Sequence, residues 1–498
     1  MKKSLLSLLL VIVMLFNVLV LAGCEFDFSL DVDDKEEVGK VVQNFDFTGV
    51  DMTKDITITF ASTQGAALKA ITDRYIAKFM ELYPNITVEH TTMGDYDDAR
   101  NTVTTQLAAG QQPNVAYCYP DHVAGYNLAN AVVSLNSLIS STVELERADG
   151  TKEIIGLTVD QIADFVPAYY AEGAQFGHVT PEGKDVMYTM PFFKSTELLY
   201  YNKTYFEDHN LTVPQTWDQM EAVCARILEI EAEAGRANKC IPLGYDSESN
   251  WFITMCEQYG SGYTSAVGEH YLFDNETNFN FVKRIREWHQ KGYVTTEALY
   301  GAYTSGLFTG SDEDGQVAYM CIGSSAGAQY QKASVVDGKP EFEVGIASIP
   351  QVDPNHAKVI SQGPSVCILQ GKNITKEEIV ASWLLVKYLT TNATYQAEYG
   401  LQSGYVPVIK SVMDNPTYAK KMSEADGYNN LTALAAKKAL EQAESYYASP
   451  AFNGSSAARE QVGYLLTTVM AIKDSDGDVD ALIRAEFKKA IEKCKSAK

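Results

Sequence analysis

Hydrophobic and polar positions follow two different periods in the body of the chain, which begins near residue 56. Residues 56–60 alternate apolar and polar side chains and are rich in β-branched residues, which predicts a strand. Residues 66–83 repeat apolar positions at helical spacing, and Pro84 ends that helix. The alternation continues with a strand, a helix and a strand at 86–88, 97–109 and 115–118. Strands that alternate with helices of this length predict parallel βαβ units.

The same pattern returns in the second part of the chain. Short apolar runs predict further strands at 197–201, 316–322, 342–346 and 366–369. Helical spacing predicts one helix from Trp217 to about Gly235, capped by Thr216, and another over 376–389. Beyond Lys410 helix dominates. The expected fold class is therefore α/β, and roughly 440 residues of body are enough for two lobes.

The N-terminal residues have the pattern of an export signal. Lys2 and Lys3 precede an apolar run that ends in small residues before Cys24. The tetrapeptide 21–24, Leu-Ala-Gly-Cys, resembles a bacterial lipobox, which implies a signal peptide over 1–23 and a lipid such as palmitate on Cys24. An uncleaved membrane anchor is the alternative. Both interpretations place the body at the cell membrane, on its extracellular face or in the periplasm, and residues 24–55 read as an acidic flexible tether.

Charge and composition narrow the function classes. The net charge of −24 argues against nucleic acid and against direct binding to anionic lipid headgroups. Seven cysteines besides Cys24 lack the spacing of a zinc or redox site, so buried or free thiols are expected, and a Cys224–Cys240 pair stays open. Nucleotide-binding, hydrolase and zincin motifs are missing. The glycine of the 474–478 segment does not fit a calcium loop, because placing Gly477 at the sixth position of the loop puts Ile472 at the first. We therefore expect no enzyme, no cofactor and no metal.

Four stretches together resemble the extracellular solute-binding proteins of ABC importers, the family that includes maltose-binding protein. They are "QQPNVAYCYPDHVAGY", "MPFFKSTELLYYNKTYF" followed by "VPQTWDQM", "LFTGSDEDGQVAYMCIGSSAG" and "SGYVPVIKSV". The resemblance implies a two-lobe periplasmic-binding-protein fold, type II-like, with a ligand cleft between discontinuous lobes. The implied crossings between lobes lie near 193–195, 363–365 and 398–404. Lobe 1 would then comprise 56–194 and 365–400, and lobe 2 would comprise 195–364 and 401–498.

The resemblance also implies a function. A monomeric, lipid-anchored protein would capture a carbohydrate, either a mono- or an oligosaccharide, and deliver it to the permease subunits of an ABC importer. One alternative is a binding protein for another solute such as a glycerophosphodiester, which would call for clustered arginines or a dense nest of N–H groups. The candidate loops lack arginine. The other alternative is an extracellular polysaccharide-acting enzyme, which would need paired carboxylates.

The strongest candidate site residues follow the third predicted strand and a loop in the second lobe. Asp121 lies where the family places a sugar-binding aspartate, and its alternative role is the N-cap of a helix that starts at His122. Tyr119 would supply an aromatic ring. Trp251 lies at the family's aromatic platform, with a core anchor as the alternative. By contrast, Trp217 and Trp383 are predicted to be core residues.

Weaker candidates lie in turns and at the implied crossings. Gly323, Ser324 and Ser325 resemble a second-lobe loop whose small residues let the backbone approach a ligand. Ser62 and Gln64 lie in the turn before a helix N-terminus, which offers free N–H groups. Further single candidates are Tyr96, Ser195, Thr196, Gln362 and Tyr405.

Overall fold

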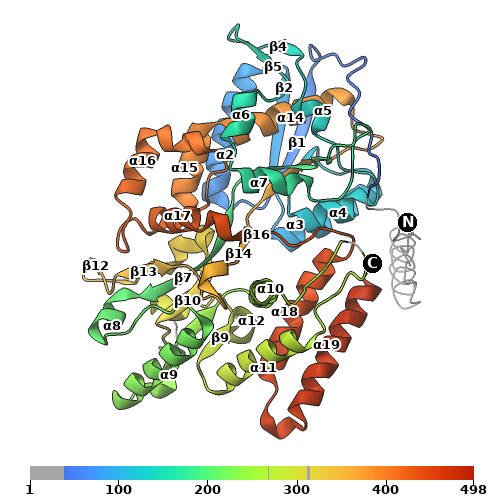
Figure 1. The fold of residues 1–498 in the computed structure, drawn as a ribbon. Coiled ribbons are helices and arrows are strands. Elements are labelled where there is room, and N and C mark those ends of the chain that lie inside the picture. The colour runs from blue at the N-terminus through green and yellow to red at the C-terminus, as the bar shows by residue number, and fades with distance from the viewer. Residues whose placement is uncertain (1–38, 267, 311–314, 498) are drawn as a thin grey trace, which may run out of the picture. The chain divides into compact units, whose positions relative to one another are not determined.

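A five-stranded sheet organises the first half of the fold (Figure 1). Its strands, in spatial order, are β2 Ile86–Thr92, β1 Ile56–Ser62, β3 Val115–Cys118, β15 Ser365–Ile368 and β6 Thr189–Pro191. β1 pairs in parallel with β2 and β3, as the alternating pattern predicts, whereas β15 runs antiparallel to β3 and β6. The computed structural model describes residues 39–266, 268–310 and 315–497. Because β15 comes from late in the chain, this half is built from separate segments, as the resemblance implies.

Helices on this sheet bury the apolar stripes that predicted them. They are α2 Ala66–Leu82, α3 Tyr96–Ala109, α14 Lys376–Thr391 and α15 Ala393–Ser403. Helix α2 buries Tyr75, Ile76 and Phe79. Helix α14 buries Trp383, which confirms the predicted core role of that residue. These side chains share one hydrophobic cluster with the sheet, which we call the first core.

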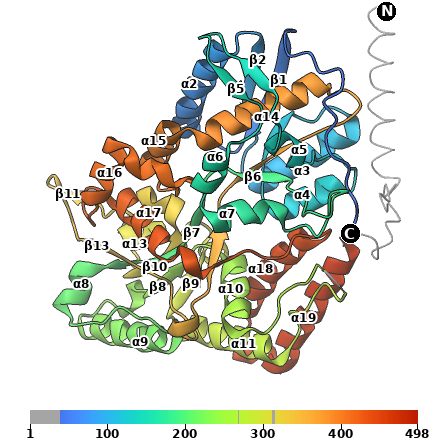
Figure 2. The same cartoon turned by 45° about the horizontal axis from the view of Figure 1, so that its top comes forward.

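A seven-stranded sheet organises the second half (Figures 1 and 2). Its strands, in spatial order, are β16 Tyr446–Tyr447, β14 Val359–Gln362, β7 Ser195–Asn202, β10 Met320–Ser324, β8 Leu243–Tyr245 and β9 Val294–Thr296, with β13 Val344–Ala347 also paired to β7. β8 runs parallel to both β9 and β10. β10 begins later than the predicted 316–322 range.

Long helices build a second core on this sheet. They are α9 Trp217–Glu233, α10 Glu248–Tyr259, α11 Glu276–Gln290, α18 Ser455–Ala471 and α19 Val479–Ser496. Thr216 and Gln219 form the capping box that starts α9, as predicted. Trp217 is buried in this second core, which confirms its predicted role. Between α18 and α19 the 474–478 segment is an acidic connection, as predicted: Asp474 pairs with Arg286, and Asp478 caps α19.

Shorter elements complete the described chain. The helices are α4 Pro120–Asn127, α5 Asn136–Ile139, α6 Val159–Asp164, α7 Pro167–Ala171, α8 Lys203–Asp208, α12 Glu297–Tyr300, α13 Ser305–Thr309, α16 Pro416–Ser423 and α17 Leu431–Glu441. Two hairpins pair β4 Glu144–Glu146 with β5 Lys152–Ile154, and β11 Val335–Val336 with β12 Lys339–Pro340.

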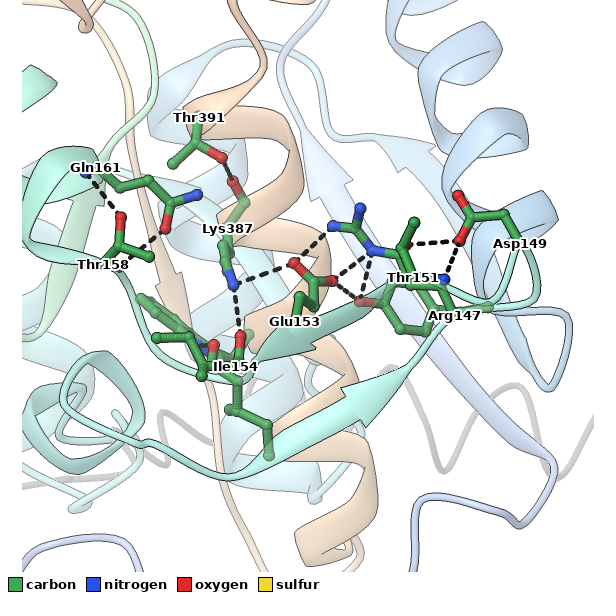
Figure 3. Close-up of polar contacts among 12 residues, drawn as sticks. Arg147, Asp149, Thr151, Glu153, Ile154, Thr158, Gln161, Lys387 and Thr391 are labelled. Atoms are coloured by element: carbon green, nitrogen blue, oxygen red, sulfur yellow. Dashed lines mark hydrogen bonds and ion pairs between the residues drawn. The ribbon is translucent and has the colours of Figure 1, made fainter.

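The β4–β5 hairpin is tied to α14 by a cluster of charged side chains (Figure 3). Glu153 accepts a hydrogen bond from Arg147 Nε at 2.7 Å and one from Lys387 Nζ at 3.2 Å. Lys387 Nζ also donates to the carbonyl oxygen of Ile154 at 2.6 Å. Lys387 of α14 therefore fixes the hairpin on the first half through an ion pair with Glu153 and a hydrogen bond to Ile154.

The chain crosses between the two halves twice at the implied places and once later. Residues 192–194 link β6 to β7, and residues 363–364 link β14 to β15. The implied third crossing at 398–404 is wrong. After Gly404 the chain runs back beside Lys194, and residues Val406, Val408, Ile409, Val412 and Tyr418 pack in the first core. Helix α17 then contacts both halves, and β16 joins the second sheet.

Residues 39–55 do not form the flexible tether that the sequence predicts. Phe45, Phe47, Val50 and Met52 pack against the first core, and Lys376 pairs with Asp46 at 2.7 Å. The sequence did not predict this packing, because the segment is acidic and its apolar residues have no regular spacing. The leader, Cys24 and the first part of the predicted tether lie outside the described residues.

Two further findings concern cysteines and membrane spans. The seven cysteines within the described ranges are all free and buried, so Cys224 and Cys240 form no disulfide. In the part of the chain that the structure describes, no helix combines the length and the apolar character required to cross a bilayer.

Candidate functional site: a ligand cleft between the two halves

Two adjoining pockets lie between the first and second halves. The inner pocket has a volume of about 80 Å³ and the outer pocket a volume of about 390 Å³. Both are lined by Tyr119 and Asp121 from the first half and by Arg459 from α18 of the second. Helices α4 and α18 are in contact here, and both views show them side by side (Figures 1 and 2). We call the two pockets together the cleft.

Asp121 links the two halves across the cleft. It lies in the first turn of α4, whose N-cap is Tyr119 and whose first residue is Pro120, so the alternative N-cap role of Asp121 is wrong. Its Oδ2 accepts a hydrogen bond from Ser456 Oγ at 2.9 Å. The carboxylate is placed favourably at a helix N-terminus and is half-buried, so it can accept further hydrogen bonds from a ligand.

Three tyrosines from separate parts of the chain meet on the first half of the cleft. The rings of Tyr96 and Tyr119 stack with centroids 4.4 Å apart and an interplanar angle of 21°. The hydroxyl oxygens of Tyr96 and Tyr405 lie 3.5 Å apart. Tyr96 lines the outer pocket, Tyr119 lines both pockets and Tyr405 lines neither. The pair of stacked rings offers the aromatic surface that the sequence analysis expects near Asp121.

Arg459 is held in place by a chain of buried polar groups. It donates a hydrogen bond to Asn250 Oδ1, and Asn250 Nδ2 donates to Glu197 Oε1 at 3.0 Å. Tyr245 donates its hydroxyl proton to the other oxygen of Glu197 at 2.7 Å. Burial raises the pKa of Glu197 to about 7, although both hydrogen bonds oppose that shift. This network fixes the guanidinium at the wall that the inner and outer pockets share.

The outer pocket is predominantly acidic. Its carboxylates are those of Asp95, Asp97, Asp121, Glu248 and Glu460, and only two guanidinium groups, Arg100 and Arg459, oppose them within the lining. The local field therefore disfavours a strongly anionic ligand in this pocket.

The inner pocket adjoins the crossing segments. Gln362 of β14 lines it, as does Glu172, which follows α7. The Glu172 carboxylate forms a buried ion pair with Lys194, and Lys194 Nζ lies 3.4 Å from Ser365 Oγ at the start of β15. One side of the pocket is thereby connected to two of the segments that join the halves.

Trp251 is not an aromatic platform, and that prediction is wrong. Its side chain is fully buried in the second core, where its ring stacks on Tyr245 with centroids 4.6 Å apart. Trp217 and Trp288 pack nearby, with ring centroids 5.9 and 6.5 Å away. Helix α10 directs Trp251 toward α9 and α11. The preceding residue, Asn250, instead accepts the hydrogen bond from Arg459 at the cleft.

The small and polar residues of the second-half candidate loop bond to one another. Ser195 Oγ lies 2.7 Å from Ser324 Oγ and 3.0 Å from Ser325 Oγ. Thr196 Oγ1 donates to the carbonyl oxygen of Ile360 at 2.8 Å. Gly323 lies within β10, where a Cβ atom would approach Asp246 Oδ2 to 2.9 Å. None of these five residues lines the inner or the outer pocket, and they join β7, β10 and β14 instead.

Ser62 and Gln64 are likewise buried away from both pockets. Ser62 Oγ lies 2.9 Å from His90 Nε2, and Gln64 Nε2 donates to the Tyr117 hydroxyl. Of the sequence candidates, the structure brings Tyr96, Tyr119, Asp121 and Gln362 to the cleft. Sequence reasoning missed Arg459 and Glu172, which lie in no quoted motif. One sequence signal could have pointed to Arg459. Small residues surround it, namely Ser455, Ser456 and Gly463, and they leave one face of that helix open.

Two α/β halves, each with its own sheet, joined by crossing strands and enclosing a cleft, define a two-lobe binding protein. The chain belongs to the bacterial extracellular solute-binding protein family, whose sequence signature matches residues 74–425. The family consists of substrate-binding proteins. The predicted family and the predicted two-lobe fold are therefore confirmed.

Curated relatives cover most of the chain. The sn-glycerol-3-phosphate-binding periplasmic protein UgpB of Salmonella paratyphi A is 23% identical over 379 residues, which are 75% of this chain and 77% of that protein. UgpB of Escherichia coli K12 is 22% identical over 365 residues, which are 72% and 75% of the two chains.

Solved structures share the fold at low sequence identity. UgpB of Mycobacterium tuberculosis, in complex with glycerophosphocholine, has a TM-score of 0.65 at 17% identity and covers 88% of this chain and 98% of its own. The sugar-binding protein MalE of Xanthomonas citri gives the same TM-score, identity and coverage. Maltose-bound MalE3 of T. maritima has a TM-score of 0.63 at 17% identity, with 87% and 99% covered.

Proposed function

We propose that this solute-binding protein captures a carbohydrate, a mono- or oligosaccharide, and delivers it to the permease of an ABC importer. The observation that carries the proposal is the grouping of Asp121, the stacked rings of Tyr96 and Tyr119, and Arg459 in one cleft. A sugar presents hydroxyl groups, which a carboxylate and a guanidinium can pair, and C–H faces, which aromatic rings cover. Both kinds of surface are present side by side.

The charge of the cleft supports a neutral ligand. The carboxylates of the outer pocket outnumber its guanidinium groups, and the whole chain carries a net charge of −24. The carboxylates would repel the negative charge of a free phosphate monoester, whereas they would not repel an uncharged sugar. Hydrogen bonds to ionised groups contribute about 1.5–3 kcal/mol each, so Asp121 and Arg459 can provide much of a sugar's affinity.

A glycerophosphodiester is the second candidate ligand, and two observations favour it. The candidate loops of the sequence analysis lack arginine, but Arg459 of α18 lines both pockets. The curated relatives described above are named for sn-glycerol 3-phosphate, and one structural relative was solved with glycerophosphocholine. A diester that also carries a cation would meet both Arg459 and the surrounding carboxylates.

A thermal-shift screen separates the two ligand classes. Wild-type protein would be scanned with maltose, maltotriose, sn-glycerol 3-phosphate and glycerophosphocholine, along with other common mono- and oligosaccharides. A ligand at about 100 times its Kd stabilises the folded state by roughly 2.7 kcal/mol, which is a readily measured shift in melting temperature. We expect a neutral sugar to produce that shift. A shift with the phosphate-bearing compounds alone would replace the carbohydrate with the second candidate.

We also propose that a lipid on Cys24 tethers the protein to the outside of the membrane, and that it works there as a monomer. The export pattern and the lipobox resemblance around Cys24 support this anchor. In cells that express the whole chain, Cys24→Ala is expected to move the processed protein from the membrane fraction to the soluble fraction. Unchanged membrane association of that variant would refute the lipid anchor.

A further inference from the structure

The inner pocket contains two hydroxyl groups that no other group in the described part of the chain binds. Tyr263 Oη and Ser449 Oγ are both buried, and neither has a hydrogen-bond partner within the described ranges of the chain. Both residues line the inner pocket together with Asp121, Glu172 and Arg459. An unpaired buried hydroxyl costs about 1–3 kcal/mol, so two of them in one pocket point to a polar group that the pocket receives.

Tyr263 is held rigidly in the second half. The residue is 4% exposed, and its ring stacks on Phe273 with centroids 6.2 Å apart. Burial raises the pKa of the Tyr263 phenol well above its usual value. The charge of Arg459 lowers this pKa and the charge of Asp121 raises it, both by less than burial does. The hydroxyl group therefore keeps its proton at physiological pH and is available as a donor next to the two charged residues of the cleft.

The charges around the pocket define its occupant. Asp121 and Glu172 are acceptors, and Lys194 neutralises Glu172 from behind. Tyr263 and Arg459 are donors, and Ser449 can be either. An anion would face both carboxylates and a cation would face Arg459, whereas an uncharged hydroxyl group can donate to one side and accept from the other. The inner pocket shares Tyr119, Asp121 and Arg459 with the outer pocket, so one end of a ligand that fills the cleft reaches it.

We propose that the inner pocket is a subsite for an uncharged, hydroxyl-bearing end of the ligand, with Tyr263 donating a hydrogen bond to a ligand oxygen and Ser449 making a second contact. This inference rests on the proposed function, because it takes the larger ligand to be a carbohydrate in the same cleft. It assigns specificity to two residues outside the quoted motifs. Because Tyr263 and Ser449 come from the second half and Asp121 from the first, the subsite is completed only when the halves meet.

Calorimetric titration of Tyr263→Phe and Ser449→Ala tests the subsite, with D-glucose, maltose and maltotriose as probes. We expect each variant to bind the sugar that wild type binds about five- to tenfold more weakly, as loss of one neutral hydrogen bond predicts. The melting temperature of each ligand-free variant should equal or exceed that of wild type, because the removed hydroxyl has no partner. A structural hydroxyl would instead lower it.

Tyr418→Phe is the matched control. Tyr418 is 1% exposed in the first core, its hydroxyl also has no partner among the described residues, and it lines neither pocket. This variant should retain wild-type affinity. Equal affinity of wild type and both cleft variants for a bound sugar would overturn the subsite and leave the proposed function intact. Failure of wild type to bind these three sugars or any other carbohydrate of the thermal-shift screen would overturn the proposed function together with this inference.

Discussion

Glu197 is a buried carboxylate that positions Arg459 at a thermodynamic cost. It is 2% exposed and accepts hydrogen bonds from Tyr245 and Asn250, yet burial still raises its pKa to about 7. In the unfolded chain its pKa is near 4.5. Between these values the folded state holds a proton that the unfolded state has released. The stability that protonated Glu197 contributes to the folded state is therefore complete below about pH 4.5 and is lost as the pH rises through 7.

Replacing Glu197 by Gln should remove this pH dependence. We expect the stability of wild type relative to Glu197→Gln to fall by about 2–3 kcal/mol between pH 4.5 and pH 8. Denaturant unfolding of both proteins across that range measures the difference. A difference that stays constant with pH would show that Glu197 is ionised in the folded protein throughout.

Glu231 provides a control of opposite sign. Burial acts to raise the pKa of Glu231, but hydrogen bonds from Arg236 and Tyr205 outweigh it and lower that pKa. The stability of wild type relative to Glu231→Gln should therefore rise, not fall, as the pH increases through the range where the carboxyl group ionises.

Among single residues, the sequence predicted four that line the cleft, and its clearest signal was at Tyr119 and Asp121. Tyr119 and Asp121 come directly after β3, so the rule that ligands bind beyond the carboxyl ends of parallel strands applies to them. Arg459 and Tyr263 lie far apart in the sequence, and only tertiary packing brings them to the cleft. Trp251 failed as a candidate because a tryptophan after a polar loop is equally consistent with a core position, and α10 directs it there.

Among the elements, the crossing segments hold the feature with the clearest energetic consequence. Lys194, on the first crossing, is fully buried and paired with Glu172, and its Nζ lies 3.4 Å from Ser365 Oγ on the second crossing. The backbone of Lys194 also pairs with Val406. One side chain thus connects the two crossings beneath the inner pocket.

Removing Lys194 alone should destabilise the protein strongly. Lys194→Met leaves the Glu172 carboxylate buried without its partner, and such a change costs about 3–5 kcal/mol. Adding Glu172→Gln removes the stranded charge and should restore most of that loss. Denaturant unfolding of the single and double variants measures both effects. If the double variant proved no more stable than Lys194→Met, the stranded charge would not be the cause of the loss.

The order of helices and strands was well predicted, because hydrophobic periodicity and the residues that begin or end a helix are local signals. The βαβ alternation of 56–118 and the capped helix at Trp217 both appear where the sequence indicates. The third crossing was misplaced because it depends on which core a segment joins. Val406 and Val408 pack on the first core, and nothing in their local sequence distinguishes the two cores. The packed segment 39–55 was missed for a similar reason, since its anchors have no period.

The whole molecule offers a ligand two walls, because the proposed function requires a solute that bridges the two halves where they meet at the cleft. Both pockets take their lining from both halves, and Asp121 already bonds across to Ser456. A ligand that contacts both walls stabilises the arrangement in which they face each other, and it can shift the population only by its preference for that arrangement. Binding affinity is therefore expected to depend on residues of the two halves together.

Calorimetric titration of wild type, Asp121→Ala and Arg459→Ala with the sugar that gives the largest thermal shift shows whether a ligand bridges the two halves. These residues lie on opposite walls of the cleft, and each should contribute about 1.5–3 kcal/mol, so each variant is expected to bind roughly ten- to a hundredfold more weakly. Both variants should remain folded, as melting curves would show. Wild-type affinity for the sugar in both folded variants would contradict the proposed bridging of the two halves, because the ligand would then bind outside this cleft.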